Sequence, residues 1–172
     1  MPGNKPLLAR RMAGIEPFHV MDILAQARAM DAQGADVVHM EVGEPDFPSP
    51  QPIIDAGIQS LRQGQTHYTP ALGLPALRQA ISDYYLCRFQ VEVEASRIVI
   101  TPGASGALQL ILGVLINPGD KVLMPDPGYP CNRHMVRMLG GETVSLGVKA
   151  SQDFALSNDQ VIRNWDQDTR AL

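Results

Sequence analysis

A short run of small residues between two apolar stretches has the composition of an anion-binding turn. Residues 101–108 read Thr-Pro-Gly-Ala-Ser-Gly-Ala-Leu, between a strand-like segment and a helical one. A strand-to-helix connection leaves the first N–H groups of the helix without partners, at the positive end of the helix dipole. Ala104, Ser105 and Gly106 are small enough for a phosphate to approach these amides. The sequence therefore predicts a phosphate site at this turn.

The same turn allows two other interpretations. Small residues also let a strand and a helix pack closely without any ligand. Residues 103–107 nearly match the Gly-x-Ser-x-Gly nucleophile elbow, in which Ser105 would attack a substrate. That elbow requires an acid and a histidine downstream, and the only later histidine is His134, inside a predicted helix. The turn taken alone leaves these interpretations open.

A tyrosine follows the next predicted strand. Residues 126–130 read Asp-Pro-Gly-Tyr-Pro, directly after the strand predicted at 121–124. Ligands of open α/β sheets bind at the carboxyl ends of parallel strands. The ring of Tyr129 could therefore lie against a flat cofactor ring, or it could simply cover the end of a helix. Gly43 and Tyr68 lie in two earlier loops and, taken singly, indicate no chemistry.

Hydrophobic periodicity predicts strands and helices in alternation around these loops. Helices are expected at 18–32, 50–63 (with Ser49 as N-cap), 74–89, 104–115 and 129–139. Ser157 and Gln160 form a capping box for a last short helix. Strands are expected at 37–42, 97–101, 121–124 and 142–146, and 168–172 reads as a turn into another strand. This order predicts an α/β fold with a mainly parallel sheet covered by helices.

Composition excludes several classes of protein. A chain of 172 residues can bury one core, and its net charge of −4 without a basic stripe argues against nucleic acid as a partner. No apolar run is long enough for a membrane span, and the N-terminus lacks a signal region, so we expect a cytoplasmic protein without membrane contacts. Cys87 and Cys131 lack metal-ligand spacing, so we expect reduced thiols and no metal site.

Five segments occur together in one order: 42–47 (Val-Gly-Glu-Pro-Asp-Phe), 67–73 with Leu77-Arg78, 101–108, 118–122, and 126–130. Together they resemble the class I/II aminotransferases, the pyridoxal-phosphate enzymes of the aspartate aminotransferase fold, over about residues 14–172. The resemblance implies a three-layer αβα fold with a mainly parallel sheet. It assigns residues 1–48 to an N-terminal arm and part of a small domain. Residues 49–172 would be the first part of the large pyridoxal-phosphate-binding domain.

The resemblance also implies a role for each loop. The backbone amides of residues 104–106 would hold the phosphate of pyridoxal 5′-phosphate, and Tyr129 would stack on its pyridine ring. Tyr68 would cross a homodimer interface and reach the phosphate bound by the neighbouring subunit. Gly43 would lie beside the substrate carboxylate.

Other parts of such a site are missing from these residues. In this family the lysine that forms the Schiff base, and the asparagine, aspartate and arginine that complete the site, come later in the chain. The lysines here, Lys5, Lys121 and Lys149, have no matching context. We therefore assign no catalytic residue and expect the chain to be truncated and inactive by itself. The resemblance implies that the full-length protein is a homodimeric aminotransferase, moving an amino group between an amino acid and a 2-oxo acid.

Two alternatives remain at this point. One is a pyridoxal-phosphate C–S lyase of the same fold, because such enzymes share these N-terminal motifs. The other is a non-catalytic binding or dimerisation module.

Overall fold

The computed structural model describes residues 8–172, so the first seven residues of the predicted arm lie outside the described residues. The chain divides into two compact units. One comprises the chain up to Glu41 together with Ala104–Leu172, and we call it the sheet unit; the other, Val42–Gly103, is the helical unit.

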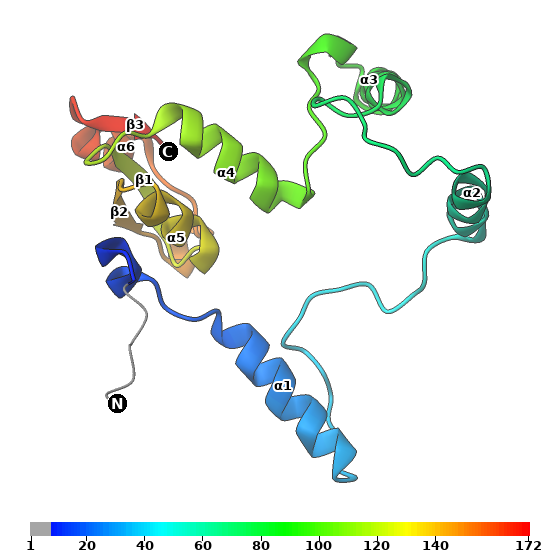
Figure 1. Ribbon diagram of the computed structural model, residues 1–172. Coiled ribbons are helices and arrows are strands. Elements are labelled where there is room, and N and C mark those ends of the chain that lie inside the picture. The colour runs from blue at the N-terminus through cyan, green and yellow to red at the C-terminus, as the bar shows by residue number, and fades with distance from the viewer. Residues whose placement is uncertain (1–7) are drawn as a thin grey trace, which may run out of the picture. The chain divides into compact units, whose positions relative to one another are not determined.

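The sheet unit contains the described strands and most of the helices (Figure 1). Its elements are η1 (Arg10–Gly14), α1 (His19–Ala32), α4 (Gly103–Leu115), β1 (Lys121–Asp126), α5 (Pro130–Met138), β2 (Glu142–Gly147), η3 (Ala150–Gln152), α6 (Asn158–Asn164) and β3 (Thr169–Ala171). The capping box predicted at Ser157 and Gln160 is confirmed, since the Gln160 N–H donates to the Ser157 hydroxyl at 3.2 Å. The turn predicted to lead into a strand at 168–172 does so as β3.

The strands form a parallel sheet in the order β2-β1-β3, as the alternation of strands and helices predicts. β1 is central, and its Leu123 lies opposite Val144 of β2. Consecutive strand residues face opposite sides of a sheet. Val122 and Leu123 are both buried, so both faces of β1 are covered, as is typical of parallel sheets.

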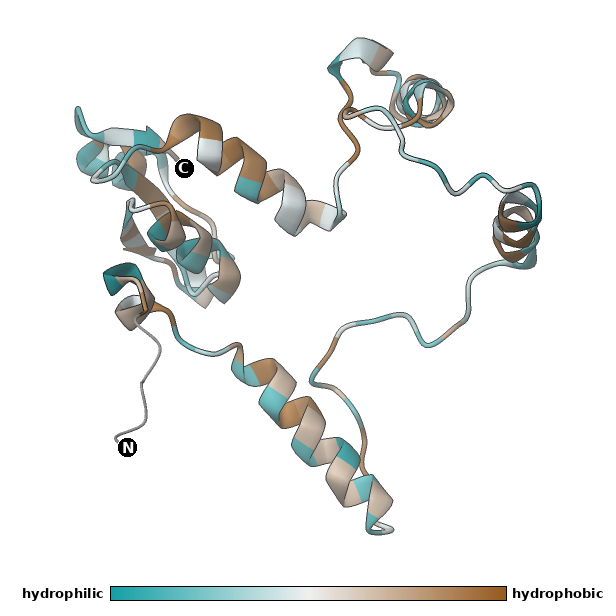
Figure 2. Cartoon of the chain, viewed as in Figure 1, coloured by the Kyte–Doolittle hydropathy of each residue, from teal (hydrophilic) through white to brown (hydrophobic). Residues whose placement is uncertain are grey.

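The hydrophobic core lies on one face of β1. Leu112 and Ile116, at the end of α4 and just after it, pack with Val122 and with Val136 of α5. Figure 2 shows that α4 is most hydrophobic toward its C-terminal end. Only one part of α4 is buried in this core, because Leu110 and Val114 are exposed on it.

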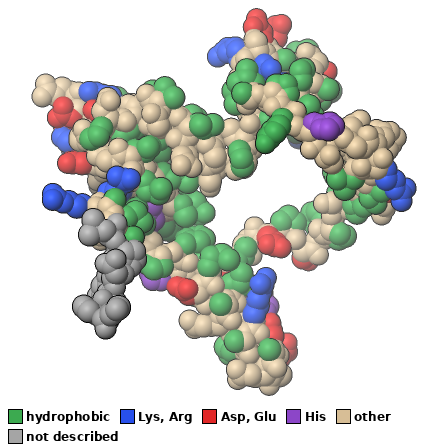
Figure 3. Space-filling model, in the orientation of Figure 1, with side chains coloured by type: hydrophobic (Ala, Val, Ile, Leu, Met, Phe, Trp, Pro, Cys, Tyr) green, Lys and Arg blue, Asp and Glu red, His purple; other side chains and the backbone are tan. Residues whose placement is uncertain are grey.

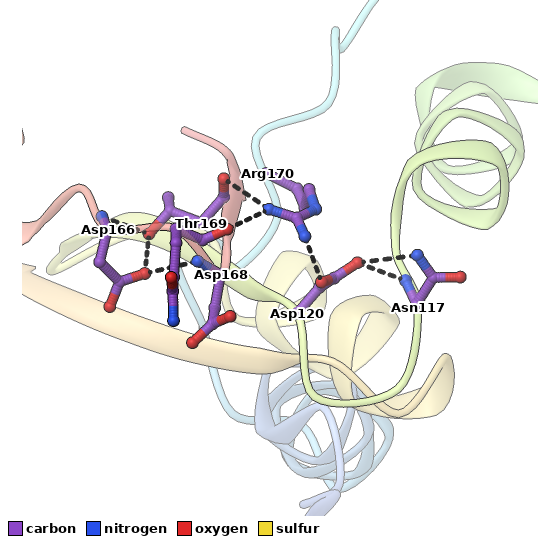
Figure 4. A network of polar contacts seen from close by, with 7 residues as sticks. Asn117, Asp120, Asp166, Asp168, Thr169 and Arg170 are labelled. Atoms are coloured by element: carbon purple, nitrogen blue, oxygen red, sulfur yellow. Dashed lines mark hydrogen bonds and ion pairs between the residues drawn. The ribbon is translucent and has the colours of Figure 1, made fainter.

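The turn between α4 and β1 is fixed by Asp120 (Figure 4). Its carboxylate accepts from the Asn117 backbone N–H at 2.8 Å and side-chain amide at 3.1 Å, and it pairs with Arg170 of β3 at 3.2 Å. The Asn117 N–H is the main reason that the pKa of Asp120 is lowered. This turn therefore links the start of β1 to β3.

A second carboxylate closes the same edge of the sheet. Asp166 accepts from the Lys121 ammonium at 2.6 Å, the Thr169 hydroxyl at 2.9 Å and the Asp168 N–H at 3.0 Å. These hydrogen bonds, led by that from Lys121, lower the pKa of Asp166 from 3.8 to about 2. The ionised carboxylate is therefore the form that the fold favours.

We expect the variant Asp166→Asn to weaken the dependence of stability on acid pH. A lowered folded-state pKa contributes stability that is complete above 3.8 and is lost as the pH falls toward about 2. The variant should be less stable than the wild type near pH 5, and the difference should shrink by pH 2. Urea unfolding at low salt across this range measures it, because salt screens exposed pairs. Parallel pH profiles of the two proteins would contradict this assignment.

The helical unit contains α2 (Gln51–Arg62), α3 (Pro75–Phe89) and η2 (Ala95–Arg97). Arg78 of α3 donates through Nε to the carbonyls of Ala95 and Ile98, each at 2.9 Å, so α3 is fixed against the segment that follows it. The N-cap residue of α2 is Pro50. The prediction of Ser49 as the N-cap was therefore wrong by one residue.

Two predicted strands do not form. Residues 37–42 and 97–101 carry no strand ladder in the structure. Ile100 donates its N–H to the carbonyl of Leu72, a loop residue, at 3.1 Å. A strand requires a neighbouring strand with which to exchange hydrogen bonds, and neither segment has one among residues 8–172.

Within the part of the chain that the structure describes, no helix combines the length and the hydropathy needed to cross a membrane.

Candidate functional site

The predicted phosphate turn forms the start of α4. The helix begins at Gly103, whose φ of 69° is a conformation that favours glycine. The Thr101 hydroxyl donates to the Gly103 carbonyl at 2.8 Å, which holds the turn closed. The N–H groups of Ala104, Ser105 and Gly106 belong to the first helical turn and so have no acceptor within the helix.

The surroundings of these amides suit an anion. Ala104 and Ser105 are exposed and Gly106 is half-buried, so the amides and the Ser105 hydroxyl are accessible. The first turn of α4 contains no acidic side chain that would repel a phosphate. α4 has 13 residues, long enough for its dipole to contribute positive potential at this end.

Tyr129 lies at the carboxyl end of β1, as predicted. It is the N-cap residue of α5, and 55% of its surface is exposed. Gly128 allows the turn before it, because a Cβ there would lie 2.5 Å from the Pro125 carbonyl oxygen. The Phe18 ring packs edge-on against Tyr129, with ring centroids 5.9 Å apart. Tyr129 thus presents a supported, accessible aromatic ring at the sheet edge.

The Tyr129 hydroxyl stays protonated at neutral pH. A hydrogen bond with the Cys131 side chain is the main reason that the pKa of Tyr129 is raised above its usual 10. A neutral phenol does not repel an anionic ligand nearby. The ring is therefore compatible with a phosphate-bearing cofactor.

Asn132 is a candidate that the sequence alone does not reveal. It lines a small cavity of about 50 Å³ beside Tyr129. Its side-chain oxygen is buried and has no hydrogen-bond donor among the described residues. In the sequence, the one feature that could have indicated Asn132 is its position three residues after Tyr129, since residues three apart lie on the same face of a helix. An unsatisfied acceptor here is consistent with a ligand that brings a donor.

The other two predicted residues belong to the helical unit. Gly43 is the centre of a three-residue turn, in which the Glu44 N–H donates to the Val42 carbonyl at 3.0 Å. Tyr68 is fully exposed. The structure therefore places residues 104–106 and Tyr129 in the sheet unit, and Gly43 and Tyr68 in the helical unit.

The structure does not bring Ser105 and His134 together as the nucleophile-elbow interpretation requires. Ser105 lies in the first turn of α4 and His134 lies within α5. Among the described residues no hydrogen bond joins the two side chains, and the buried Nδ1 of His134 has no partner.

The residues present fit pyridoxal 5′-phosphate by their chemistry. The α4 turn offers amide donors and a hydroxyl without a carboxylate, and Tyr129 offers a neutral aromatic face. These are the two kinds of group that a phosphate and a planar pyridine ring require.

Comparison with known proteins defines the class. Residues 35–171 match the family model described as aminotransferase class I and II. The chain is 37% identical over 168 residues to the aspartate aminotransferase of Bacillus sp. (strain YM-2), covering 98% of this chain and 43% of that protein. It is 43% identical over 138 residues to the (5-formylfuran-3-yl)methyl phosphate transaminase of Methanocaldococcus jannaschii, covering 80% of this chain and 37% of that protein.

Solved structures of aminotransferases have the same fold as this chain. An aminotransferase from Mycobacterium tuberculosis superposes with a TM-score of 0.88 at 34% identity, over 95% of this chain and 42% of that chain. The chain belongs to the class I and II aminotransferase family, whose members depend on pyridoxal phosphate, and it has the fold of the N-terminal portion of the large domain. It spans about two fifths of the length of these relatives.

Proposed function

We propose that the full-length protein is a pyridoxal-phosphate-dependent aminotransferase, which moves an amino group between an amino acid and a 2-oxo acid. The observation that carries this proposal is the α4 turn: exposed small residues at a helix N-terminus without acidic side chains, within a chain that matches the family over residues 35–171. The cofactor, when bound, supplies the electron sink that amino transfer requires. We place this protein in the cytoplasm.

In this proposal each candidate residue has one task. The amides of Ala104, Ser105 and Gly106 bind the phosphate, and Tyr129 orients the ring by stacking. Gly43 lets the backbone approach the substrate carboxylate. Residues 1–48 form the arm and part of the small domain, and 49–172 form the first part of the large domain.

Amino transfer is favoured over C–S lysis by the relatives. The relatives described above are an aspartate aminotransferase, a transaminase and an aminotransferase of solved structure, which are 37%, 43% and 34% identical to this chain over the matched regions. These relatives support amino transfer as the reaction class.

The test uses the protein expressed from its complete reading frame and loaded with pyridoxal 5′-phosphate. We expect amino transfer that requires both an amino acid and a 2-oxo acid. Release of pyruvate from cystathionine without an oxo acid would instead identify a lyase. Absence of both activities in a folded, loaded protein would favour a binding or dimerisation module.

The 172-residue chain by itself is proposed to bind the cofactor weakly and to be inactive. The Lys121 ammonium donates a hydrogen bond to Asp166 at 2.6 Å, and Lys149 is an exposed residue after β2.

Cofactor binding by the 172-residue chain can be measured with pyridoxamine 5′-phosphate, because this probe has no aldehyde to react with surface lysines. It should quench or shift fluorescence on binding, whereas pyridoxamine, which lacks the phosphate, should bind at least tenfold more weakly.

We further propose a homodimer in which Tyr68 serves the partner's site. Tyr68 is fully exposed, so its hydroxyl is available to another chain. Hydrophobic side chains also stand on the surface (Figure 3), among them Leu110, Ile111 and Val114 of α4. Apolar surfaces of this kind are typical of contacts with another chain or domain.

We expect Tyr68→Phe to weaken cofactor retention in the full-length dimer by about 10-fold to 100-fold, because a hydrogen bond to a charged group contributes about 1.5–3 kcal/mol. Dialysis followed by absorbance of the remaining cofactor measures the change. Tyr84→Phe is the matched control, since Tyr84 is an exposed tyrosine of α3 in the same unit. Equal retention in both variants would argue against a role for Tyr68 in the partner's site.

A further inference from the structure

A second cavity lies between α5 and the segment that enters α1. Its volume is about 400 Å³, enough for a small organic molecule. Residues 16–20 form one wall. The other wall consists of α5 residues at spacings of three and four, on one face of the helix: Pro130, Arg133, His134 and Arg137. None of the residues at the α4 turn lines it.

Two positively charged arginine side chains lie in the α5 wall of this cavity. Arg133 and Arg137 are four residues apart on α5, a spacing at which like charges repel. Arg133 has one weak ion pair, with Asp126 at 3.6 Å. Arg137 donates to the uncharged Gly14 carbonyl at 2.5 Å, and among the described residues it forms no salt bridge. The positive charge is therefore only partly compensated.

A buried ring nitrogen between these arginines is also unsatisfied. Nδ1 of His134 is buried without any hydrogen-bond partner among residues 8–172. Buried polar atoms are rarely left in this state. In the tautomer that carries its proton on Nδ1, His134 has an unused N–H donor, which is the kind of group that an oxyanion requires. His134 lies next to Arg133 in sequence and three residues before Arg137, so all three line the same cavity.

The opposite wall adds backbone donors. Phe18 is the N-cap of the 14-residue helix α1 and offers no side-chain acceptor to its first N–H groups. The remaining charged or titratable groups of the lining are His19, which lies 3.5 Å from Asp22, and Glu16. Glu16 is the single carboxylate in the lining, against two guanidinium groups.

We propose that this cavity binds a small oxyanion, a carboxylate or a phosphate, between the guanidinium groups of Arg133 and Arg137. Guanidinium groups bind both anions through paired N–H donors. His134 and the first turn of α1 contribute further polar contacts. Arg133 also lines the small cavity beside Tyr129, but none of the residues that line the proposed oxyanion site belongs to the α4 turn, so anion binding at the cavity and at the α4 turn can be tested separately.

The test is a residue-resolved titration of the ¹⁵N-labelled 172-residue chain at neutral pH and constant ionic strength. One series uses inorganic phosphate and the other uses succinate. We expect saturable shifts in the amide signals of Val20, Arg133 and Arg137 with at least one anion. Saturation by phosphate alone, by succinate alone, or by both identifies which oxyanion the cavity accepts.

Charge-neutral variants decide whether the arginines carry the binding. Arg137→Gln should weaken it at least tenfold, and the double variant Arg133→Gln/Arg137→Gln should abolish saturation. Arg163→Gln is the matched control, because Arg163 is an exposed arginine of α6 and should leave the affinity unchanged. Unchanged signals from β1 residues such as Leu123 show that each variant is folded.

Three results would overturn the proposal. These are shifts that stay linear with concentration for both anions, equal affinity in the double variant, or an equal loss in Arg163→Gln. If Arg137→Gln loses the fold through its contact with Gly14, Arg133→Gln alone tests the same point. Phosphate-dependent shifts at Ala104–Gly106 report on the α4 turn separately, so they neither support nor contradict the cavity.

Discussion

Replacing Leu123 with alanine is expected to lower the free energy of unfolding of the sheet unit by about 2–5 kcal/mol, the range for a buried leucine truncated in a packed core. Leu123 is fully buried, with 0% of its surface exposed, in the central strand β1. It pairs with Val144 of β2, and the preceding residue Val122 pairs with Ala171 of β3, so a void at Leu123 lies where the three strands meet. Since a small unit has only about 5–15 kcal/mol of stability, this is a large fraction of it.

Urea unfolding followed by the fluorescence of Trp165 measures this loss. Trp165 is the single tryptophan of the chain and follows α6 in the same unit. The matched control is Ile162→Ala on α6, since Ile162 is 72% exposed and alanine is a good helix former. We expect the control to change the free energy of unfolding by less than about 1 kcal/mol. Similar losses in the two variants would mean that Leu123 does not pack as the structure indicates.

The helices were predictable because their signals are local. α1 and α3 lie within one residue of their predicted ends, and the Ser157–Gln160 capping box marks the start of α6. Caps, glycine stops and apolar spacing all act within one or two helical turns of the chain. The sequence therefore contains the information that positions these elements.

The strands could be predicted only in part from local sequence signals. β1 and β2 were predicted at their observed starts, but residues 97–101, equally apolar, form no ladder. Apolar alternation indicates that a segment can be buried, whereas a strand also needs a neighbour at the right register. That neighbour is not encoded in the segment itself.

The residues of the candidate sites likewise fall into those that the sequence could indicate and those that it could not. The α4 turn and Tyr129 could be named as candidates from their residue types, and Tyr129 also from its place after β1. Asn132 and the Arg133–Arg137 cavity were not, because an unsatisfied oxygen and two partly compensated charges are visible only after packing. Helical spacing could have grouped these α5 residues, but it could not have shown that they face a cavity.

Ser105→Asp is expected to abolish binding of pyridoxamine 5′-phosphate while leaving the fold intact. The new carboxylate would stand among the amides of the first turn of α4, where the phosphate is proposed to bind, and would both occupy these donors and repel the anion. A charge of this sign at a helix N-terminus stabilises the helix by about 0.3–1 kcal/mol. Binding and stability should therefore change in opposite directions, which a general loss of structure cannot produce.

Two further variants separate charge from position. Asn158→Asp adds the same charge at the exposed first turn of α6, in the same unit, and should leave binding unchanged. Ser105→Ala removes only the hydroxyl, so we expect a loss of about 10-fold or less, because the backbone amides remain.

Fluorescence titration gives the affinity, and urea unfolding gives the stability of each variant. If Ser105→Asp binds pyridoxamine 5′-phosphate as tightly as the wild type, the phosphate does not occupy the α4 turn. If Asn158→Asp loses binding to the same extent, net charge and not the turn controls the affinity. Loss confined to position 105, with unfolding free energy equal to or above that of the wild type, would place the phosphate at the turn that begins α4.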